Sequence, residues 1–94
     1  MNFEWDNNKE QANVAKHGVD FAEARQAFSD PDAIVLFDES HSGKTELRWW
    51  LLGKVDKRIL LVRYTHRSPS LIRIIGAAYW RIAEEIYYEK NQKN

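Results

Sequence analysis

The chain of 94 residues contains no cysteine, only two prolines and four glycines, and no long hydrophobic run. Without cysteine, disulfides and thiolate zinc sites are excluded. Apolar runs such as residues 59–62 are far too short to span a bilayer, so we expect no membrane contact. The chain starts with acidic residues at Glu4 and Asp6, where a secretory leader would be basic. We therefore expect a cytoplasmic protein.

The residues that are present suit one hydrophobic core. Hydrophobic residues make up 44% of the chain, and there are four each of Trp, Tyr and Phe. A chain of this length has room for one core only. The sequence therefore predicts a single domain over residues 1–94.

The net charge of zero hides an asymmetry between the two halves of the chain. Residues 1–46 carry four Lys/Arg against ten Asp/Glu, and residues 47–94 carry ten against four. A basic half is typical of a protein that holds phosphates on one face, and arginine binds phosphate with two parallel hydrogen bonds. The alternative is that the two halves simply pair with each other.

The hydrophobic period changes from helical to alternating along the chain. Asp6 is a good N-cap for a first helix, and Asp20 with Glu23 forms a capping box for a second. In chain order we expect a strand at 3–5, a helix over about 7–17, a helical segment from 21 to Pro31, a strand at 33–37, a polar loop over 38–44, strands at 47–55, 58–65 and 71–75, and a helix over about 78–89. Helices followed by strands, without alternation, favour an α+β fold with a four-stranded, mostly antiparallel sheet between a short N-terminal strand, two helices and a C-terminal helix.

Several of the expected strands carry one arginine each. Because side chains alternate along a strand, Arg48 shares a face with Trp50, and Arg73 interrupts an apolar row. Adjacent strands that each carry an arginine, with Arg63 on the strand between, predict a cationic patch that stays open to solvent. The alternative is that Arg73 forms a structural ion pair with Glu46.

The chemistry available is that of Arg, Lys, Glu, His and Tyr. The glycines are scattered, so there is no phosphate-binding glycine loop, and the histidines lack metal-ligand spacing. Only His41, near Asp38 and Glu39, is a weak zinc candidate, and we expect no metal or cofactor. These side chains suffice for metal-free RNA cleavage, in which the ribose 2′-hydroxyl attacks the adjacent phosphorus. Tyr79 and Trp80, beside Arg81, are candidates to stack an exposed base, although Trp80 in the core is the alternative.

Short runs over nearly the whole chain resemble one family. They are Phe3–Asp6, Lys9, Asn13, Lys16–Val19, Phe21, Glu23–Ala24, Phe28, Asp30–Pro31, Asp38, Glu46, Arg48, Gly53, Tyr64–Thr65, Arg67, Ile72–Ile75, Tyr87 and Glu89. Taken together they resemble the BrnT family, the toxin half of a bacterial type II toxin–antitoxin pair. The resemblance implies a RelE-like ribonuclease fold, RNA cleavage and growth arrest. It also implies neutralisation by a BrnA-like ribbon-helix-helix antitoxin. The toxin would contact operator DNA only indirectly, through this antitoxin.

The resemblance also implies a set of site residues. It assigns phosphate binding to Arg48, Arg67 and Arg73, and proton transfer to Glu46 or His17. The alternative for Glu46 is that it is the structural partner of an arginine. For RNA binding the resemblance adds Lys16, which joins the candidates taken from the residues themselves, Arg63, Tyr79, Trp80 and Arg81. Arg63 is basic where family members are usually apolar or aromatic, so its assignment comes from the strand pattern alone.

One position departs from the family pattern. The family usually has an arginine where this chain has Ala78. Arg81 lies one turn further along the expected helix and is the candidate to replace it. The alternative is a weakened or inactive nuclease that binds its antitoxin and tunes operon repression.

Overall fold

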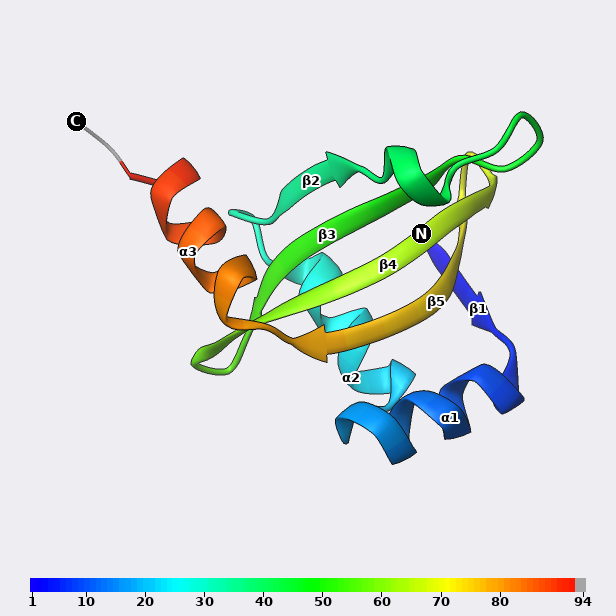
Figure 1. Cartoon of the computed structure of the whole chain (residues 1–94), viewed down its shortest axis with the longest axis horizontal. Coiled ribbons are helices and arrows are strands. Elements are labelled where there is room, and N and C mark those ends of the chain that lie inside the picture. Colours follow the sequence, from blue (N-terminus) through cyan, green and yellow to red (C-terminus); the bar gives the residue numbers. More distant parts are fainter. Residues whose placement is uncertain (93–94) are drawn as a thin grey trace.

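The computed structural model describes residues 1–92 and has the expected α+β fold (Figure 1). Five strands form one sheet in the order β1-β5-β4-β3-β2. The strands are β1 (Asn2–Trp5), β2 (Ile34–Phe37), β3 (Arg48–Val55), β4 (Arg58–Ser68) and β5 (Leu71–Tyr79), and the helices are α1 (Asn7–His17), α2 (Phe21–Gln26) and α3 (Arg81–Lys90). Both predicted N-caps are confirmed, since the carboxylates of Asp6 and Asp20 accept hydrogen bonds from backbone N–H groups in the first turns.

The hairpin of β3 and β4 forms the centre of the sheet. A two-residue turn joins the strands, and Asp56 adopts the left-handed conformation there, with φ of 56°. Such turns match the twist of the strands they connect. The strands expected at 47–55 and 58–65 thus form an antiparallel hairpin, in which Val55 pairs with Arg58.

The sheet has one strand more than the sequence indicated. β1 pairs in parallel with β5, from Asn2 opposite Leu71 to Trp5 opposite Ile74, and so extends the antiparallel sheet. The sequence of a four-residue strand does not indicate which other strand it pairs with, because that pairing depends on the tertiary fold.

The boundary between β5 and α3 also differs from the prediction. The helix was expected from about Ala78, but Gly76, Ala77 and Ala78 continue β5 by pairing with β4, and α3 begins at Arg81. Alanine has the highest helix propensity, but intrinsic propensity is a weak preference, and pairing with a central strand outweighs it.

One face of the sheet is covered by α2 and the residues around it. Figure 1 shows α2 behind the sheet, where Phe21 and Ala24 are fully buried with strand residues of the core. At Gly53 the backbone of β3 approaches the 3₁₀ turn Ala27–Ser29 so closely that a Cβ would lie 2.4 Å from the carbonyl oxygen of Ala27. Only glycine fits at this contact.

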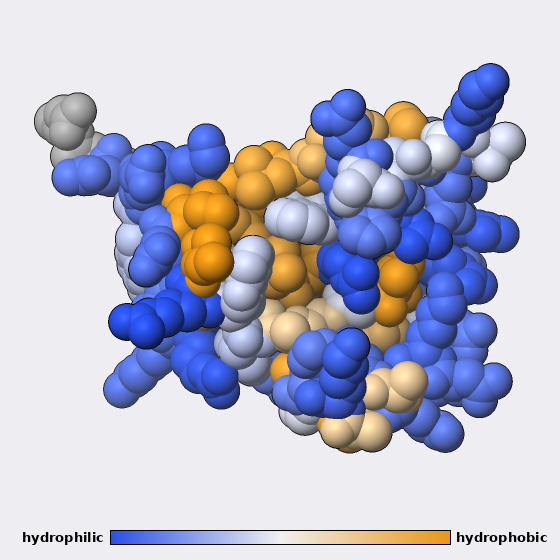
Figure 2. Space-filling model, in the orientation of Figure 1, coloured by the Kyte–Doolittle hydropathy of each residue, from blue (hydrophilic) through white to orange (hydrophobic). Residues whose placement is uncertain are grey.

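The opposite face is covered at one end only. Ala83 and Tyr87 of α3 pack there on Leu52 and Ile59. The rest of this face is open, and Figure 2 shows it hollowed, with apolar side chains on the floor and hydrophilic ones along the margins. We call this region the open face.

The free edge of β5 is closed by a side chain of α1. Beyond Ile74, β5 has no pairing with β1. There Asn13 donates to the carbonyl of Ala77 at 2.8 Å and accepts from its N–H at 3.1 Å, and it also donates to the carbonyl of Val19 at 2.9 Å. Asn13 therefore stands in for a sheet partner and fixes α1 beside the open face.

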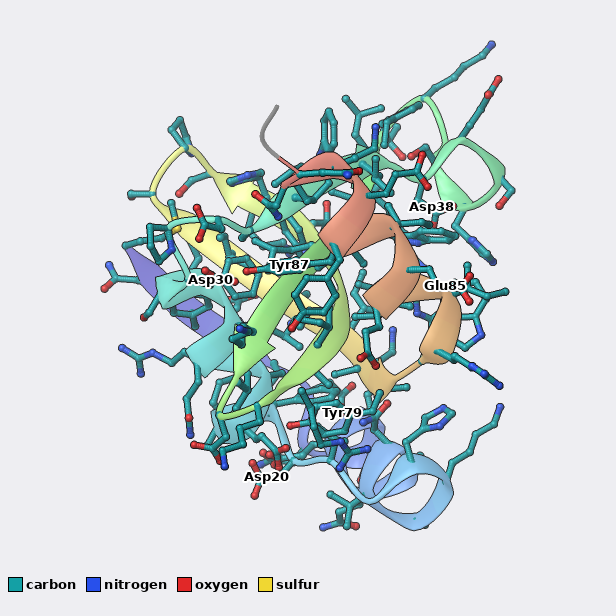
Figure 3. The ribbon with its side chains drawn as sticks, turned by 90° about the vertical axis from the view of Figure 1, so that its left-hand side faces the viewer. Asp20, Asp30, Asp38, Tyr79, Glu85 and Tyr87 are labelled. Atoms are coloured by element: carbon teal, nitrogen blue, oxygen red, sulfur yellow. The ribbon has the colours of Figure 1, made fainter. Side chains whose placement is uncertain are left out.

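A carboxylate links α3 to the turn before β2. Asp30 accepts from the Tyr87 hydroxyl at 2.6 Å and from the backbone N–H of Lys54 at 2.7 Å, and Figure 3 shows Tyr87 pointing toward it. Burial alone would raise the pKa of Asp30, but these hydrogen bonds outweigh it and lower the pKa below the usual 3.8.

We expect acid to remove this contribution to stability. A carboxyl with a lowered pKa in the folded state stabilises the fold above its unfolded pKa, and the stabilisation is lost as the pH falls through the folded pKa. Thermal melts of the wild type should therefore show a falling melting temperature below about pH 4. In Asp30→Asn, which keeps an acceptor but does not titrate, this fall should be smaller; an equal fall in both proteins would contradict the link.

Candidate RNA-binding face

A row of polar side chains crosses the open face from strand to strand. Arg48 of β3 lies opposite Thr65 of β4, which lies opposite Arg73 of β5, and Glu4 of β1 follows in register. Neighbouring strands are about 4.8 Å apart, so the two arginine backbones are about 10 Å apart on one face. The predicted gathering of Arg48 and Arg73 on one face is thus found in the structure.

These arginines are not free of carboxylates. Arg48 Nε donates to Glu46 Oε1 at 2.8 Å, and Arg73 Nε donates to Glu4 Oε2 at 2.8 Å. The alternative that Arg73 pairs with Glu46 is therefore wrong, because Glu4 follows Arg73 in register while Glu46 lies two residues from Arg48. Arg67, at an irregularity of β4, lies 3.9 Å from the same Glu4 oxygen.

The ion pairs are open to solvent and hence weak. The paired side chains of Arg48, Arg73 and their carboxylates are 30–39% exposed. Pairs in such positions contribute about 0–1 kcal/mol. An incoming phosphate can therefore replace either carboxylate at small cost.

Glu46 is held in its ionised form. The hydrogen bond from Arg48 is the main cause that lowers the pKa of Glu46; partial burial opposes it, and the charges of Arg48, Arg67 and Lys9 add to it. A carboxylate with a lowered pKa is a weak base. This geometry agrees with the alternative of Glu46 as partner of an arginine.

A second cationic group lies beside the row, where β4 and β5 meet α1. The guanidinium of Arg63 lies over Gly76, so that a Cβ there would come within 2.9 Å of an Arg63 nitrogen. Arg63 shares a hollow of about 270 Å³ with Lys9, Lys16 and His17, and no carboxylate lines it. Within residues 1–92, Arg63 makes no ion pair and no side-chain hydrogen bond. This hollow, the cationic hollow, is suited to an anion.

An apolar hollow of about 490 Å³ adjoins the cationic hollow. Trp50, Leu61, Ala78 and Trp80 line it, together with Arg63, His17, Asn13, Ala77 and Tyr79. The ring of Trp80 meets that of Trp50 edge to face, with centroids 6.5 Å apart, and Trp80 is 41% exposed. Core packing of Trp80 is therefore not what the structure shows.

Two other predicted RNA-binding residues, Tyr79 and Arg81, are less available to RNA, although Tyr79 also lines the apolar hollow. The ring of Tyr79 is covered by Arg58, whose guanidinium carbon lies 3.7 Å from the ring centroid, and its hydroxyl donates to Glu23. Arg81 is at the start of α3, in a small hollow with Arg58 and Glu84. The argument that Arg81 replaces an arginine at position 78 is wrong, since Ala78 belongs to a strand and the two positions share no helix face.

Sequence reasoning missed a cluster at the end of β2. Asp38 is 3% exposed and accepts hydrogen bonds from the Trp50 indole at 2.8 Å and from Ser40 at 3.1 Å, and the His41 ring contacts both its oxygens. Burial raises the pKa of Asp38, but these hydrogen bonds outweigh it and hold the pKa below 3.8. The spacing of Asp38 and His41 in a polar loop was the only signal, and it pointed to a weak zinc site.

Neither a metal-ligand cluster nor a membrane helix is found in the part of the chain that the structure describes. No group of three or more His, Asp or Glu side chains is arranged to hold an ion within residues 1–92. The helices of these residues fall short of the length and hydrophobicity needed to cross a bilayer.

Comparisons with known proteins point to one family. Residues 5–84 match the family model described as the ribonuclease toxin BrnT of type II toxin–antitoxin systems. The crystal structure of the Brucella abortus ribonuclease toxin BrnT is similar, with a TM-score of 0.66 and 27% sequence identity over 85% of this chain and 96% of that one. No curated protein sequence matches the chain.

Proposed function

This chain belongs to the BrnT family of ribonuclease toxins of type II toxin–antitoxin systems, and we propose that it is a single-domain, metal-independent endoribonuclease of the cytoplasm that binds RNA on its open face. The observation that carries the proposal is the cationic hollow, where half-buried Arg63 lies with Lys9 and Lys16 and without a carboxylate. A cation that is partly buried and unpaired is costly unless an anion joins it. A phosphate of the RNA backbone meets this requirement.

The row beside the hollow supplies the second set of cations. Arg48, Arg67 and Arg73 are three guanidinium groups that share two carboxylates, Glu46 and Glu4. When RNA binds, a phosphate exchanges with a carboxylate, and a guanidinium then faces the charge that grows on phosphorus during attack by the 2′-hydroxyl. Groups aimed at such charge are the largest source of catalysis in many enzymes.

The apolar hollow fits an unstacked base. The exposed ring of Trp80 and the neighbouring Trp50 offer aromatic surface beside Arg63. Stacking of this kind selects single-stranded RNA, because paired bases cannot leave their own stack at low cost. We therefore propose a single-stranded substrate, with the base in the apolar hollow and a phosphate in the cationic hollow.

An antitoxin partner follows from membership of a type II family. We propose that it is a BrnA-like ribbon-helix-helix protein, that operator DNA is contacted through it, and that the free toxin arrests growth. Growth of cells that express the chain alone, compared with cells that co-express the antitoxin, tests this part.

Cleavage of RNA in the presence of EDTA tests the nuclease directly. The purified chain should cut single-stranded RNA into products with a 2′,3′-cyclic phosphate and a 5′-hydroxyl, and it should leave DNA of the same sequence intact because DNA lacks the attacking hydroxyl. Arg73→Ala, purified in parallel, controls for contaminating nuclease and should cut at least tenfold more slowly. Binding should weaken with salt, with a slope of about −0.7 in log affinity per phosphate contact. Intact RNA, or equal cleavage by Arg73→Ala, would overturn the proposal.

A weakened or inactive nuclease is the second candidate. Ala78 lines the apolar hollow at a position where an arginine would face RNA, and both Arg48 and Arg73 are hydrogen-bonded to carboxylates. If RNA stays intact while the antitoxin still binds, the chain is a docking module. Ala78→Arg should then restore cleavage.

A further inference from the structure

The strongest feature that the proposed function leaves unused is the pair of Asp38 and His41. His41 Nδ1 lies 3.0 and 2.9 Å from the two carboxylate oxygens of Asp38. The His41 side chain is 50% exposed, whereas that of Asp38 is 2% exposed. A buried carboxylate thus holds a histidine whose ring reaches solvent.

The hydrogen bonds around Asp38 define which His41 nitrogen carries the proton. The Trp50 indole and the Ser40 hydroxyl both donate to Asp38, which favours its ionised form. An ionised carboxylate only accepts, so Nδ1 carries a proton and donates it. In the neutral ring Nε2 is then a free acceptor, and the carboxylate stabilises the imidazolium that forms when Nε2 takes up a proton.

The pair lies at the end of the arginine row. The Asp38 N–H donates to the Arg48 carbonyl at 3.0 Å, so Asp38 adjoins Arg48 across the strands. The N–H of Arg48 donates in turn to Ser42 Oγ at 2.9 Å, and Ser42 Oγ donates to the Asp38 carbonyl at 2.7 Å. The loop that carries His41 is therefore fixed to the strand that carries Arg48, through hydrogen bonds on both sides of Ser42.

We propose that His41 is the general base of RNA cleavage, oriented by Asp38 as a positioning residue; this inference rests on the proposed function. His41 Nε2 accepts the proton of the ribose 2′-hydroxyl as the 2′-oxygen forms its bond to phosphorus. The bond from phosphorus to the 5′-oxygen breaks, and that oxygen takes a proton from water. The imidazolium then returns its proton to solvent, which leaves a 2′,3′-cyclic phosphate, a 5′-hydroxyl and the enzyme unchanged.

His41 is better suited to this role than the two groups that the sequence suggested. Glu46 is bound to Arg48, which lowers its pKa and weakens it as a base. His17 lies at the exposed end of α1 and has no side-chain hydrogen bond among the described residues that would fix its ring. His41 has both a free nitrogen and a partner that orients it.

Three variants separate a base from a structural histidine. His41→Asn keeps an N–H donor for Asp38 but has no nitrogen that titrates, so a purely structural histidine would be replaced without loss. Asp38→Asn removes the charge that orients the ring. His66→Ala, which removes an exposed histidine of β4 whose ring packs on that of Tyr64, is the matched control. Each is measured by single-turnover cleavage, by binding of a 2′-O-methyl RNA that cannot be cut, and by thermal melting.

We expect His41→Asn to lower the cleavage rate about 10²–10⁴-fold while binding of the methylated RNA stays within twofold. Added imidazole should partly restore cleavage by His41→Asn, because it supplies the missing base. Asp38 contacts His41, Glu39 lies in the same turn, and Arg48 of β3, which pairs with Glu46, adjoins Asp38. Asp38→Asn should lower the rate at least tenfold, and His66→Ala should leave it unchanged.

The outcomes distinguish the two proposals. If His41→Asn cleaves RNA at a rate within threefold of the wild-type rate, the role of His41 is overturned and the proposed nuclease function stands. Absence of cleavage by the wild type overturns the proposed function and this inference with it. If His41→Asn melts like the wild type, binds RNA and fails to cut, the role of His41 is supported.

Discussion

Replacing Arg48 with alanine should lower the single-turnover rate of RNA cleavage by about 10²–10³, the usual cost of removing one donor aimed at transition-state charge. Arg48 links the row of arginines to the pair of Asp38 and His41. Its side chain is bound to Glu46, and its backbone adjoins Asp38. The loss cannot come from protonation of Glu46, because without Arg48 the pKa of that carboxyl returns toward its ordinary 4.5 and the group stays ionised at neutral pH.

Two further variants make the Arg48 measurement specific. Arg48→Lys keeps the charge but not the planar fork, so we expect an intermediate rate. Arg25→Ala removes an arginine of α2, whose guanidinium lies over the Phe3 ring away from the row, and it should cleave at the wild-type rate. An Arg48→Ala rate within threefold of the wild type would show that the row of arginines is not the reaction centre.

Replacing Asn13 with alanine should destabilise the fold by about 3 kcal/mol. Asn13 is 8% exposed and makes three hydrogen bonds to the backbone of Val19 and Ala77. Each buried backbone group left without a partner costs about 1–3 kcal/mol, and water reaching the edge of the sheet reduces the total. For a domain of this size the melting temperature should fall by about 10–20 °C.

The control for Asn13 is Gln11→Ala on the exposed side of the same helix. That variant should melt within about 2 °C of the wild type, since exposed substitutions change stability by about 0.5 kcal/mol or less. A similarly small change in Asn13→Ala would mean that the edge of β5 is held by other contacts.

Local sequence signals predicted the structure correctly where a single residue type determines the local backbone conformation. Asp6 and Asp20 cap the helices as predicted, and a turn at Asp56 and Lys57 joins the two strands expected at 47–55 and 58–65. These features depend on neighbours within four residues. The end of β5 was predicted wrongly because the helix preference of the alanines at 77 and 78 is weaker than pairing with β4, a separate strand, which decided their conformation.

In the site, too, local features could be predicted from the sequence and long-range contacts could not. Alternation along the strands was enough to place Arg48 on the face that also carries Arg73, since side chains on a strand point alternately to its two faces. It could not show that Glu4 would lie beside Arg73, because that contact joins residues 69 positions apart. The contact of Asp38 with Trp50 was equally hidden, as it forms only when β2 pairs with β3.

The amino-acid sequence by itself determined the helix caps, the central hairpin, the α+β class and the supply of arginines, because each depends on local conformation or composition. The tertiary structure alone decided which carboxylate meets which arginine, which cations share a hollow with Arg63 and which histidine is held by a buried aspartate. The physical reason is that hydrogen bonds and ion pairs act over a few ångströms. Pairing of the strands sets those distances, and no pattern along the chain records them.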